Sequence, residues 1–342
     1  MAFDNLHLEK GMYRESGKSF SQVLEALDPS EAYKGTALEG TDAFQRQLKR
    51  FNIRVKGAGS DTVEKFFATY ESAVLFPEFI SRIVRQGIEE ADILPSIVAT
   101  VTNIDAMDYR SVFSEPSDDD KELAYVMEGT SIPATTIRTR DSLVRLKKHG
   151  RMLVASYEAL RFQKLDLFSV MLRQIGAHIR TSQVRDAVDY IIEGDNNTDG
   201  ATDYYVGTSP ISGTSGTLTY EQLIEFWAQF YPYEVNTMLV SPTGMINLLK
   251  LPELQNPMTG LNFQGTGKLT TPLGAELLTC PTLNDDAVLA LDRRYALEMV
   301  QSGDVSVEYD KLIDRQLERA AITTLCGFSK ICGDAAKVLY IE

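Results

Sequence analysis

The longest regular pattern along the chain is a helical one near its middle. Apolar side chains recur at spacings of three and four from Leu165 through Leu172 to Ile179, and a neighbouring stripe continues to residue 191. This pattern predicts a helix over residues 157–193 that ends at the glycine at position 194. Even 30 residues of such a helix would span about 45 Å, so we expect it to act as a structural spine.

Residues 1–75 predict short helices in a polar context. Ser19 and Gln22 are spaced as a capping box, and Asp42 and Asp61 mark the starts of two further helices. Phe76-Pro77 closes this region, and a helix is expected over residues 79–88. None of the short helices has enough apolar surface for a compact domain. We therefore expect an extended arm that borrows its stability from neighbours.

Alternation of side chains predicts strands between residues 97 and 154. Segments 97–104 and 107–113 predict two strands around a turn. Segments 134–140 and 143–154 alternate as well but hold too few apolar residues to pack on themselves. We expect them to form the two arms of a long β-hairpin that projects from the body.

The last third of the chain predicts a second unit of helices and strands. The Gly/Ser/Thr/Pro-rich segment 207–216 is the expected domain boundary. Thr219 and Gln222 form a capping box before a helix, and a buried strand at 237–240 leads to Ser241-Pro242 and a helix over 245–251. Further strands are expected at 288–291, 305–308 and 337–341, and the last two should rejoin the sheet that carries the spine helix.

Composition and charge narrow the class of protein. The chain has 342 residues, 44% hydrophobic and 24% charged, which suits a soluble globular protein of about two domains. Its 34 basic and 48 acidic residues give a net charge of −14, which argues against a free-standing nucleic-acid binder. The sequence has no run of 18 apolar residues and does not start like a signal peptide. We expect no membrane span, and synthesis in a cytoplasm.

One short segment is basic within this acidic chain. Residues 138–164 hold eight basic and two acidic side chains. A solvated face is the simpler interpretation; the alternative is that the segment docks on an acidic surface of a like subunit, because complementary potentials set the register between partners. The candidate contact residues are Arg138, Arg140, Arg145, Lys147, Lys148 and Arg151.

Candidate chemistry is sparse. Residues 11–19 resemble a phosphate-binding loop but place five residues between the glycines where that motif has four. Asp195–Gly200 matches the first half of a calcium loop, but the twelfth position is Val206, so a surface turn is favoured. The three histidines and three cysteines form no close pair. We expect no catalytic residue, cofactor or metal, although a hydrolase or nucleotide enzyme stays open as a different class.

Several runs of residues resemble the major capsid proteins of tailed bacteriophages. They are Leu153-Val-Ala-Ser-Tyr-Glu158-Ala-Leu at the start of the spine, Leu291-Asp-Arg-Arg-Tyr-Ala-Leu297, Gly303-Asp-Val-Ser-Val-Glu308, Asp314-Arg-Gln-Leu-Glu-Arg319 and Gly327-Phe-Ser-Lys-Ile331. The resemblance covers about residues 75–342 and implies an α+β, Hong Kong 97-like capsid fold. It divides the chain into an N-terminal arm (1–75), a P-domain in three parts (76–122, 155–216 with the spine helix, and 293–342), an E-loop hairpin (123–154) and an A-domain (217–292).

The function that the resemblance implies is structural. The chain would assemble with itself, as pentamers and hexamers, into the icosahedral head shell of a tailed phage that encloses double-stranded DNA held by weak, non-specific contacts. A portal, a separate scaffolding protein and an optional decoration protein would be its partners, with assembly in the host cytoplasm and a final place in the virion. An encapsulin-like nanocompartment shell is the alternative.

Two departures from the family pattern shape these expectations. Some members carry a long N-terminal scaffolding segment that a protease removes; the arm here is too short for one, so we expect no cleavage. Some members crosslink an E-loop lysine to an asparagine in a P-domain turn, but residues 302–314 contain no asparagine. We therefore expect a shell without covalent crosslinks.

Overall fold

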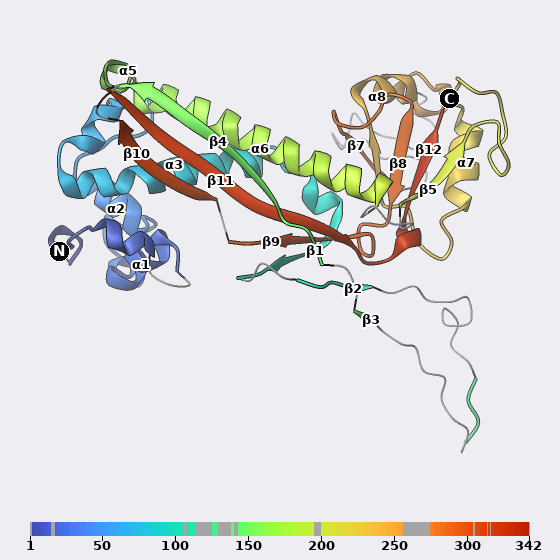
Figure 1. Cartoon of the computed structure of the whole chain (residues 1–342), viewed down its shortest axis with the longest axis horizontal. Helices are drawn as coiled ribbons and strands as arrows, with labels where there is room; N and C mark the ends of the chain where they lie inside the picture. Colours follow the sequence, from blue (N-terminus) through green and yellow to red (C-terminus); the bar gives the residue numbers. More distant parts are fainter. Residues whose placement is uncertain are drawn as a thin grey trace. The chain divides into compact units, whose positions relative to one another are not determined.

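The computed structural model describes residues 2–14, 18–105, 109–113, 125–128, 138–139, 143–194, 200–255, 274–303, 305–312, 314 and 316–341. The chain divides into two compact units (Figure 1). The first comprises Met1–Ala91, His149–Arg180 and Asp304–Thr324, and the second Asp92–Lys148, Thr181–Gly303 and Leu325–Glu342.

The first unit is mainly helical. Its elements are η1 (Ala2–Asn5), η2 (Lys10–Arg14), α1 (Phe20–Leu27), η3 (Ser30–Tyr33), α2 (Ala43–Arg50), η4 (Val63–Phe67), α3 (Tyr70–Glu90), α5 (Tyr157–Phe162) and β10 (Ser306–Leu312), with parts of β4 (Lys147–Ser156), α6 (Leu165–Glu193) and β11 (Leu317–Lys330). Strands β10 and β11 pair antiparallel, from Ser306 opposite Thr323 to Leu312 opposite Leu317. The capping box expected at Ser19 and the helix start expected at Asp42 are confirmed, and Asp42 also forms a capping box with Gln45.

The expectation of a loosely packed N-terminal region is wrong. Phe20, Leu24 and Phe44 are buried in one core together with Phe76 of α3 and Leu172 of α6. The short helices thus have small apolar faces individually, but they share a core with α3 and with the first half of α6. Whether this region also acts as an arm toward a neighbouring subunit stays a prediction.

The expected break at Phe76-Pro77 is wrong, because Pro77 lies inside a helix. Helix α3 begins at Tyr70, with Thr69 as its N-cap, and continues through Pro77 to Glu90. A proline in a helix removes one backbone hydrogen bond. Phe76 and Phe79 on either side are buried in the core, and this packing offsets that loss.

The spine helix is confirmed over most of its length but is interrupted near its start. Helix α5 ends at Phe162, and α6 runs from Leu165 to Glu193, about 44 Å at 1.5 Å per residue. Between them the chain pairs with residues 61–63: the carbonyl of Gln163 accepts from Val63 N–H at 3.0 Å, and Leu165 N–H donates to the Asp61 carbonyl at 2.9 Å. These backbone bonds take the place of helical ones for the Gln163 carbonyl and the Leu165 N–H.

Glycines allow α3 and α6 to cross with their backbones in contact. A Cβ atom on Gly176 would lie 2.2 Å from the Val84 carbonyl oxygen, and one on Gly87 would lie 2.2 Å from the Arg173 carbonyl oxygen. Real Cβ atoms do not approach so closely. This crossing fixes the first half of the spine helix on α3.

The second unit combines short helices with strands from three sheets. Its elements are η5 (Leu94–Ser96), β1 (Val98–Asn103), β2 (Val112–Phe113), β3 (Arg138–Thr139), β5 (Thr202–Tyr205), α7 (Tyr220–Ala228), β6 (Thr237–Val240), α8 (Pro242–Leu249), α9 (Pro252–Gln255), β7 (Glu276–Thr279), β8 (Ala287–Leu291), β9 (Leu297–Gln301), η7 (Gly333–Ala335) and β12 (Ala336–Tyr340), with the remaining parts of β4, α6 and β11. Strand β9 pairs parallel with β1 and antiparallel with the end of β11.

A five-stranded sheet in the order β5-β12-β8-β6-β7 forms the centre of this unit. One face, with Leu239 and Leu289, packs on the end of α6 through Val188. The other face, with Val240 and Val288, is covered by α7 and α8 (Figure 1). The predicted strands at 237–240 and 288–291 and the caps at Thr219 and Ser241 are confirmed.

The two last predicted strands lie in different sheets, although a common sheet was expected. Strand β12 pairs with β8 and β5, whereas β10 pairs with β11. Both faces of β12 are buried, since Val338 contacts one core and Leu339 the other. The domain boundary expected at 207–216 is wrong, because this segment lies within the second unit and holds the fully buried Ile211. The division into arm, P-domain, E-loop and A-domain stays a prediction.

Candidate inter-subunit interface

The six basic residues singled out from the sequence lie along one stretch of chain. Arg138 is in β3, Arg145 precedes β4, and Lys147, Lys148 and Arg151 are in β4. Arg140 lies outside the described residues.

The two expected arms of the hairpin pair with other strands. In the described residues β3 pairs antiparallel with β2, with Arg138 opposite Phe113. Strand β4 pairs with β11. Within the described residues the two arms therefore do not pair with each other, as the single hairpin of 134–140 against 143–154 requires. The segments that lead into these strands, residues 109–111 (the first stem) and 143–146 (the second stem), still contact each other, since Val144 N–H donates to the Tyr109 carbonyl at 2.9 Å.

A buried carboxylate holds the first stem. Glu298 of β9 is 6% exposed, and its Oε1 accepts hydrogen bonds from Thr102 Oγ1 at 2.5 Å and from Tyr109 OH at 2.7 Å. Its Oε2 accepts from the Ser111 hydroxyl. Burial, followed by this hydrogen bond to Glu298, raises the pKa of Tyr109. The cluster anchors residues 109–111 to β9, and nothing in the local sequence pattern around Glu298 indicated it.

The second stem is held by close packing at a glycine. A Cβ atom on Gly327 would lie 2.6 Å from the Arg145 carbonyl oxygen and 3.1 Å from the Val144 side chain. Val144 itself is buried. The backbone at Arg145 is therefore fixed against β11.

Most of the basic side chains between Arg145 and Arg151 are exposed to solvent. Arg145, Lys148 and Arg151 are exposed, and none has an ion-pair partner within the described part of the chain. Lys147 is partly neutralised, because its Nζ lies 3.1 Å from Asp186 Oδ1 of α6. Exposed, unpaired arginines and lysines on a fixed backbone suit recognition of a negatively charged partner surface.

The end of α6 carries the opposite charge. Asp186, Asp189 and Glu193 follow at spacings of three and four, and the last turn of the helix has no basic residue. Acidic groups at a helix C-terminus oppose the helix dipole. Burial, then Glu193 and Asp186, raise the pKa of the Asp189 carboxyl. The negative charge in this region is thus only partly compensated within the described chain.

The other candidate motifs acquire no chemistry from the structure. In the loop that resembles a phosphate-binding motif, residues 10–14 form a short 3₁₀ helix, and no strand precedes it in the described chain. Residues 15–17 of that loop, and residues 195–199 of the candidate calcium loop, lie outside the described residues. His7 Nδ1 lies 3.0 Å from Glu71 Oε1, and none of the three cysteines forms a disulfide in the described part of the chain. Among the described residues there is no cluster of three or more His, Cys, Asp or Glu suited to a metal ion. No helix in that part of the chain is long and apolar enough to cross a bilayer.

Comparison of the sequence with known protein families identifies the family of this chain. The sequence model of a family described as phage capsid protein matches residues 139–319, more than half of the chain. The chain belongs to this family. It is a shell-forming structural subunit and a component of the virion. The match spans β4, the spine helix, strands β5 to β10 and the start of β11, including Arg145 to Arg151.

Solved structures agree on the fold. The capsid of an empty GTA particle superposes with a TM-score of 0.52 at 14% identity, covering 73% of this chain and 90% of that one. A Microbacterium phage Oxtober96 structure gives 0.51 at 11% identity, with 73% and 90% covered. The expected α+β, Hong Kong 97-like capsid fold is confirmed. No curated protein sequence matches the chain significantly.

Proposed function

We propose that this capsid protein forms the icosahedral head shell of a tailed phage, as pentamers and hexamers that enclose double-stranded DNA. The observation that carries the proposal is the match to phage capsid proteins across the spine helix and strands β5 to β9. The GTA capsid with the same fold was computed with C5 symmetry, which supports a fivefold arrangement here.

The net charge of −14 suits a container for DNA. Tight binding of phosphates requires many lysine and arginine contacts, and this chain has an acidic excess. We propose weak, non-specific contact with the packaged DNA. A portal, a separate scaffolding protein and an optional decoration protein complete the partners, with assembly in the host cytoplasm.

The basic stretch gives the subunit contact a mechanism. Arg138, Arg140, Arg145, Lys147, Lys148 and Arg151 would lie over an acidic surface of a neighbouring subunit, with the end of α6 as the acceptor. Two observations support this: Arg145, Lys148 and Arg151 are exposed, and the last turns of α6 carry Asp186, Asp189 and Glu193 with no basic residue in the final turn. Complementary surfaces on one chain produce contacts between successive copies, as shells require.

The test is a charge reversal scored by assembly. We expect Arg138→Glu, Arg140→Glu and Arg145→Glu together to reduce shell yield while the subunit stays folded, as judged by circular dichroism. The matched control reverses Lys34, Lys49 and Lys56, which are exposed elsewhere and change the net charge equally. Normal shells from the arginine variant would exclude the contact.

Shell contents test the rest of the proposal. Purified native particles should show the 260 nm absorbance of packaged DNA. Particles that hold protein instead of nucleic acid would identify an encapsulin-like nanocompartment and overturn the genome-container function.

A further inference from the structure

Helix α7 has an apolar stripe on the side facing away from its own core. Its inner face buries Leu223 and Phe226 against the sheet. On the outer face Ile224 is 40% exposed, Trp227 42% exposed, and Tyr231, just after the helix, 90% exposed. The spacing of three residues places Ile224 and Trp227 side by side on the helix, and Tyr231 follows in the turn after its end.

Such a row is unusual on a surface with no partner. Tryptophan and tyrosine are enriched among residues that dominate binding energy at protein interfaces, because each buries a large area with few rotatable bonds. A helix of a single folded unit needs only one apolar face, and α7 already uses its inner face. The outer row thus indicates a contact with another surface.

Helix α8, on the same face of the sheet, carries a second outward stripe (Figure 1). Ile246 is 54% exposed and Leu249 41% exposed. The charges at the ends of the two stripes are opposite: Glu221 lies one turn before Ile224, and Lys250 lies one turn after Ile246. Both are exposed.

We propose that the outer face of α7 packs on the outer face of α8 of a second copy of this chain. An antiparallel arrangement of the two helices places Ile224 and Trp227 against Ile246 and brings Glu221 beside Lys250. Both surfaces belong to one chain, so a copy that offers its α7 face also offers its α8 face to another copy. This contact rests on the proposed function, since a shell is what brings copies together, and it is separate from the basic stretch near β4.

Trp227 gives a direct readout because the chain contains a single tryptophan. We expect its emission to shift to shorter wavelength on assembly, and its quenching by acrylamide to fall at least about threefold relative to the free subunit. Shells in which Trp227 stays as accessible as in the free subunit would overturn the contact while leaving the shell function intact. Failure to form shells under any condition would instead count against the proposed function.

Substitutions separate this contact from a general effect on folding. Tyr231→Lys changes a side chain that is 90% exposed, so the subunit should keep its circular dichroism spectrum and melting temperature. We expect it to raise the protein concentration needed for assembly about tenfold or more, the effect of losing an interface hot spot. An unchanged threshold concentration would contradict the proposal.

A charge swap tests the antiparallel register. Glu221→Lys and Lys250→Glu should each weaken assembly, and the double variant should restore it. Glu31 and Lys34 form an exposed pair at 3.8 Å in the first unit, so the same swap there is the matched control and should leave assembly unchanged. A double variant no better than the single ones would overturn the pairing of Glu221 with Lys250.

Discussion

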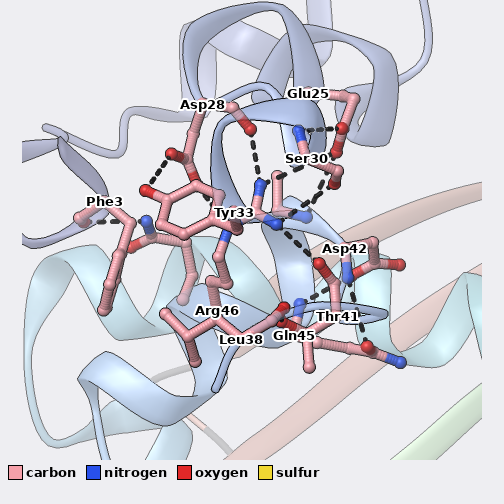
Figure 2. A network of polar contacts seen from close by, with 12 residues as sticks. Phe3, Glu25, Asp28, Ser30, Tyr33, Leu38, Thr41, Asp42, Gln45 and Arg46 are labelled. Atoms are coloured by element: carbon pink, nitrogen blue, oxygen red, sulfur yellow. Dashed lines mark hydrogen bonds and ion pairs between the residues drawn. The ribbon is translucent and has the colours of Figure 1, made fainter. Parts of the chain in front are cut away.

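Arg46 is the most deeply buried charge in the first unit, with a side chain that is 0% exposed. Its Nε donates to Asp28 Oδ2 at 2.6 Å, its Nη1 donates to the Thr41 carbonyl at 2.5 Å, and its guanidinium lies 4.3 Å above the Tyr33 ring (Figure 2). The Tyr33 hydroxyl donates to the other oxygen of Asp28. The network links α1, η3 and α2, which individually have little apolar surface.

Removing Arg46 should therefore destabilise the whole N-terminal region. Arg46→Met leaves the buried Asp28 carboxylate without its positively charged partner, and breaking a buried ion pair in this way costs about 3–5 kcal/mol. Denaturant unfolding of the subunit measures the loss. Lys34→Ala, which breaks an exposed pair, is the control and should change the free energy of unfolding by less than about 1 kcal/mol. Equal effects of the two substitutions would contradict the role given to Arg46.

Asp292 is a second buried carboxylate, in the second unit. Burial opposes its ionisation, but hydrogen bonds from Arg294, Glu234 N–H and Asn236 outweigh burial and lower its pKa below the usual 3.8. Because the folded-state pKa is the lower one, the stabilisation is complete above about pH 4 and is lost as the pH falls through the folded value.

Thermal unfolding against pH tests this assignment. Asp292→Asn should melt at a lower temperature than the wild type at pH 7, and the difference should shrink between about pH 4 and pH 2. A difference that stays constant over that range would show that the charge of Asp292 does not stabilise the fold.

At the scale of elements, the crossing of α3 and α6 depends on two glycines. Gly176→Ala would place a methyl group against the Val84 carbonyl. The atoms nearest to that methyl group belong to the backbone of α3, which cannot move aside as a side chain can. We expect a loss of about 2 kcal/mol or more, although alanine in an unobstructed helix would add about 1 kcal/mol of stability. Gly333→Ala, where nothing lies within 4 Å, is the control for the free energy of unfolding. A neutral Gly176→Ala variant would mean that the helices do not touch there.

Elements with local signals could be predicted from the sequence. The caps at Ser19, Asp42, Thr219 and Ser241 depend on residues three positions apart, and the spine helix on a repeat of three and four. Strand β11 could not be found in this way. Its buried face includes Glu318 and Thr324, so its inside–outside alternation is not an apolar–polar one.

The candidate site could be predicted only in part, for the same physical reason. A basic segment is visible in the sequence, whereas its supports depend on residues far apart along the chain. Glu298 lies 189 residues from Tyr109, and Gly327 becomes informative only when β11 is known to pass Arg145. Likewise, the outer row on α7 requires knowledge of which face the core uses.

At the scale of the whole molecule, the absence of asparagine between residues 302 and 314 predicts a shell without covalent links between subunits. Boiled and denatured shells should run as a single band of 38.1 kDa on a gel. A ladder of multiples of that mass that survives boiling and reduction would show that crosslinks form by another pair of residues.

The central claim is that this chain is the subunit of a closed shell. Gel filtration of the expressed protein, alone and together with the genes that flank it, followed by negative-stain microscopy of the void peak, tests that claim most directly. The account predicts closed, uniform particles tens of nanometres across that consist of this chain. A 38.1 kDa monomer in both experiments, at every concentration, would contradict it.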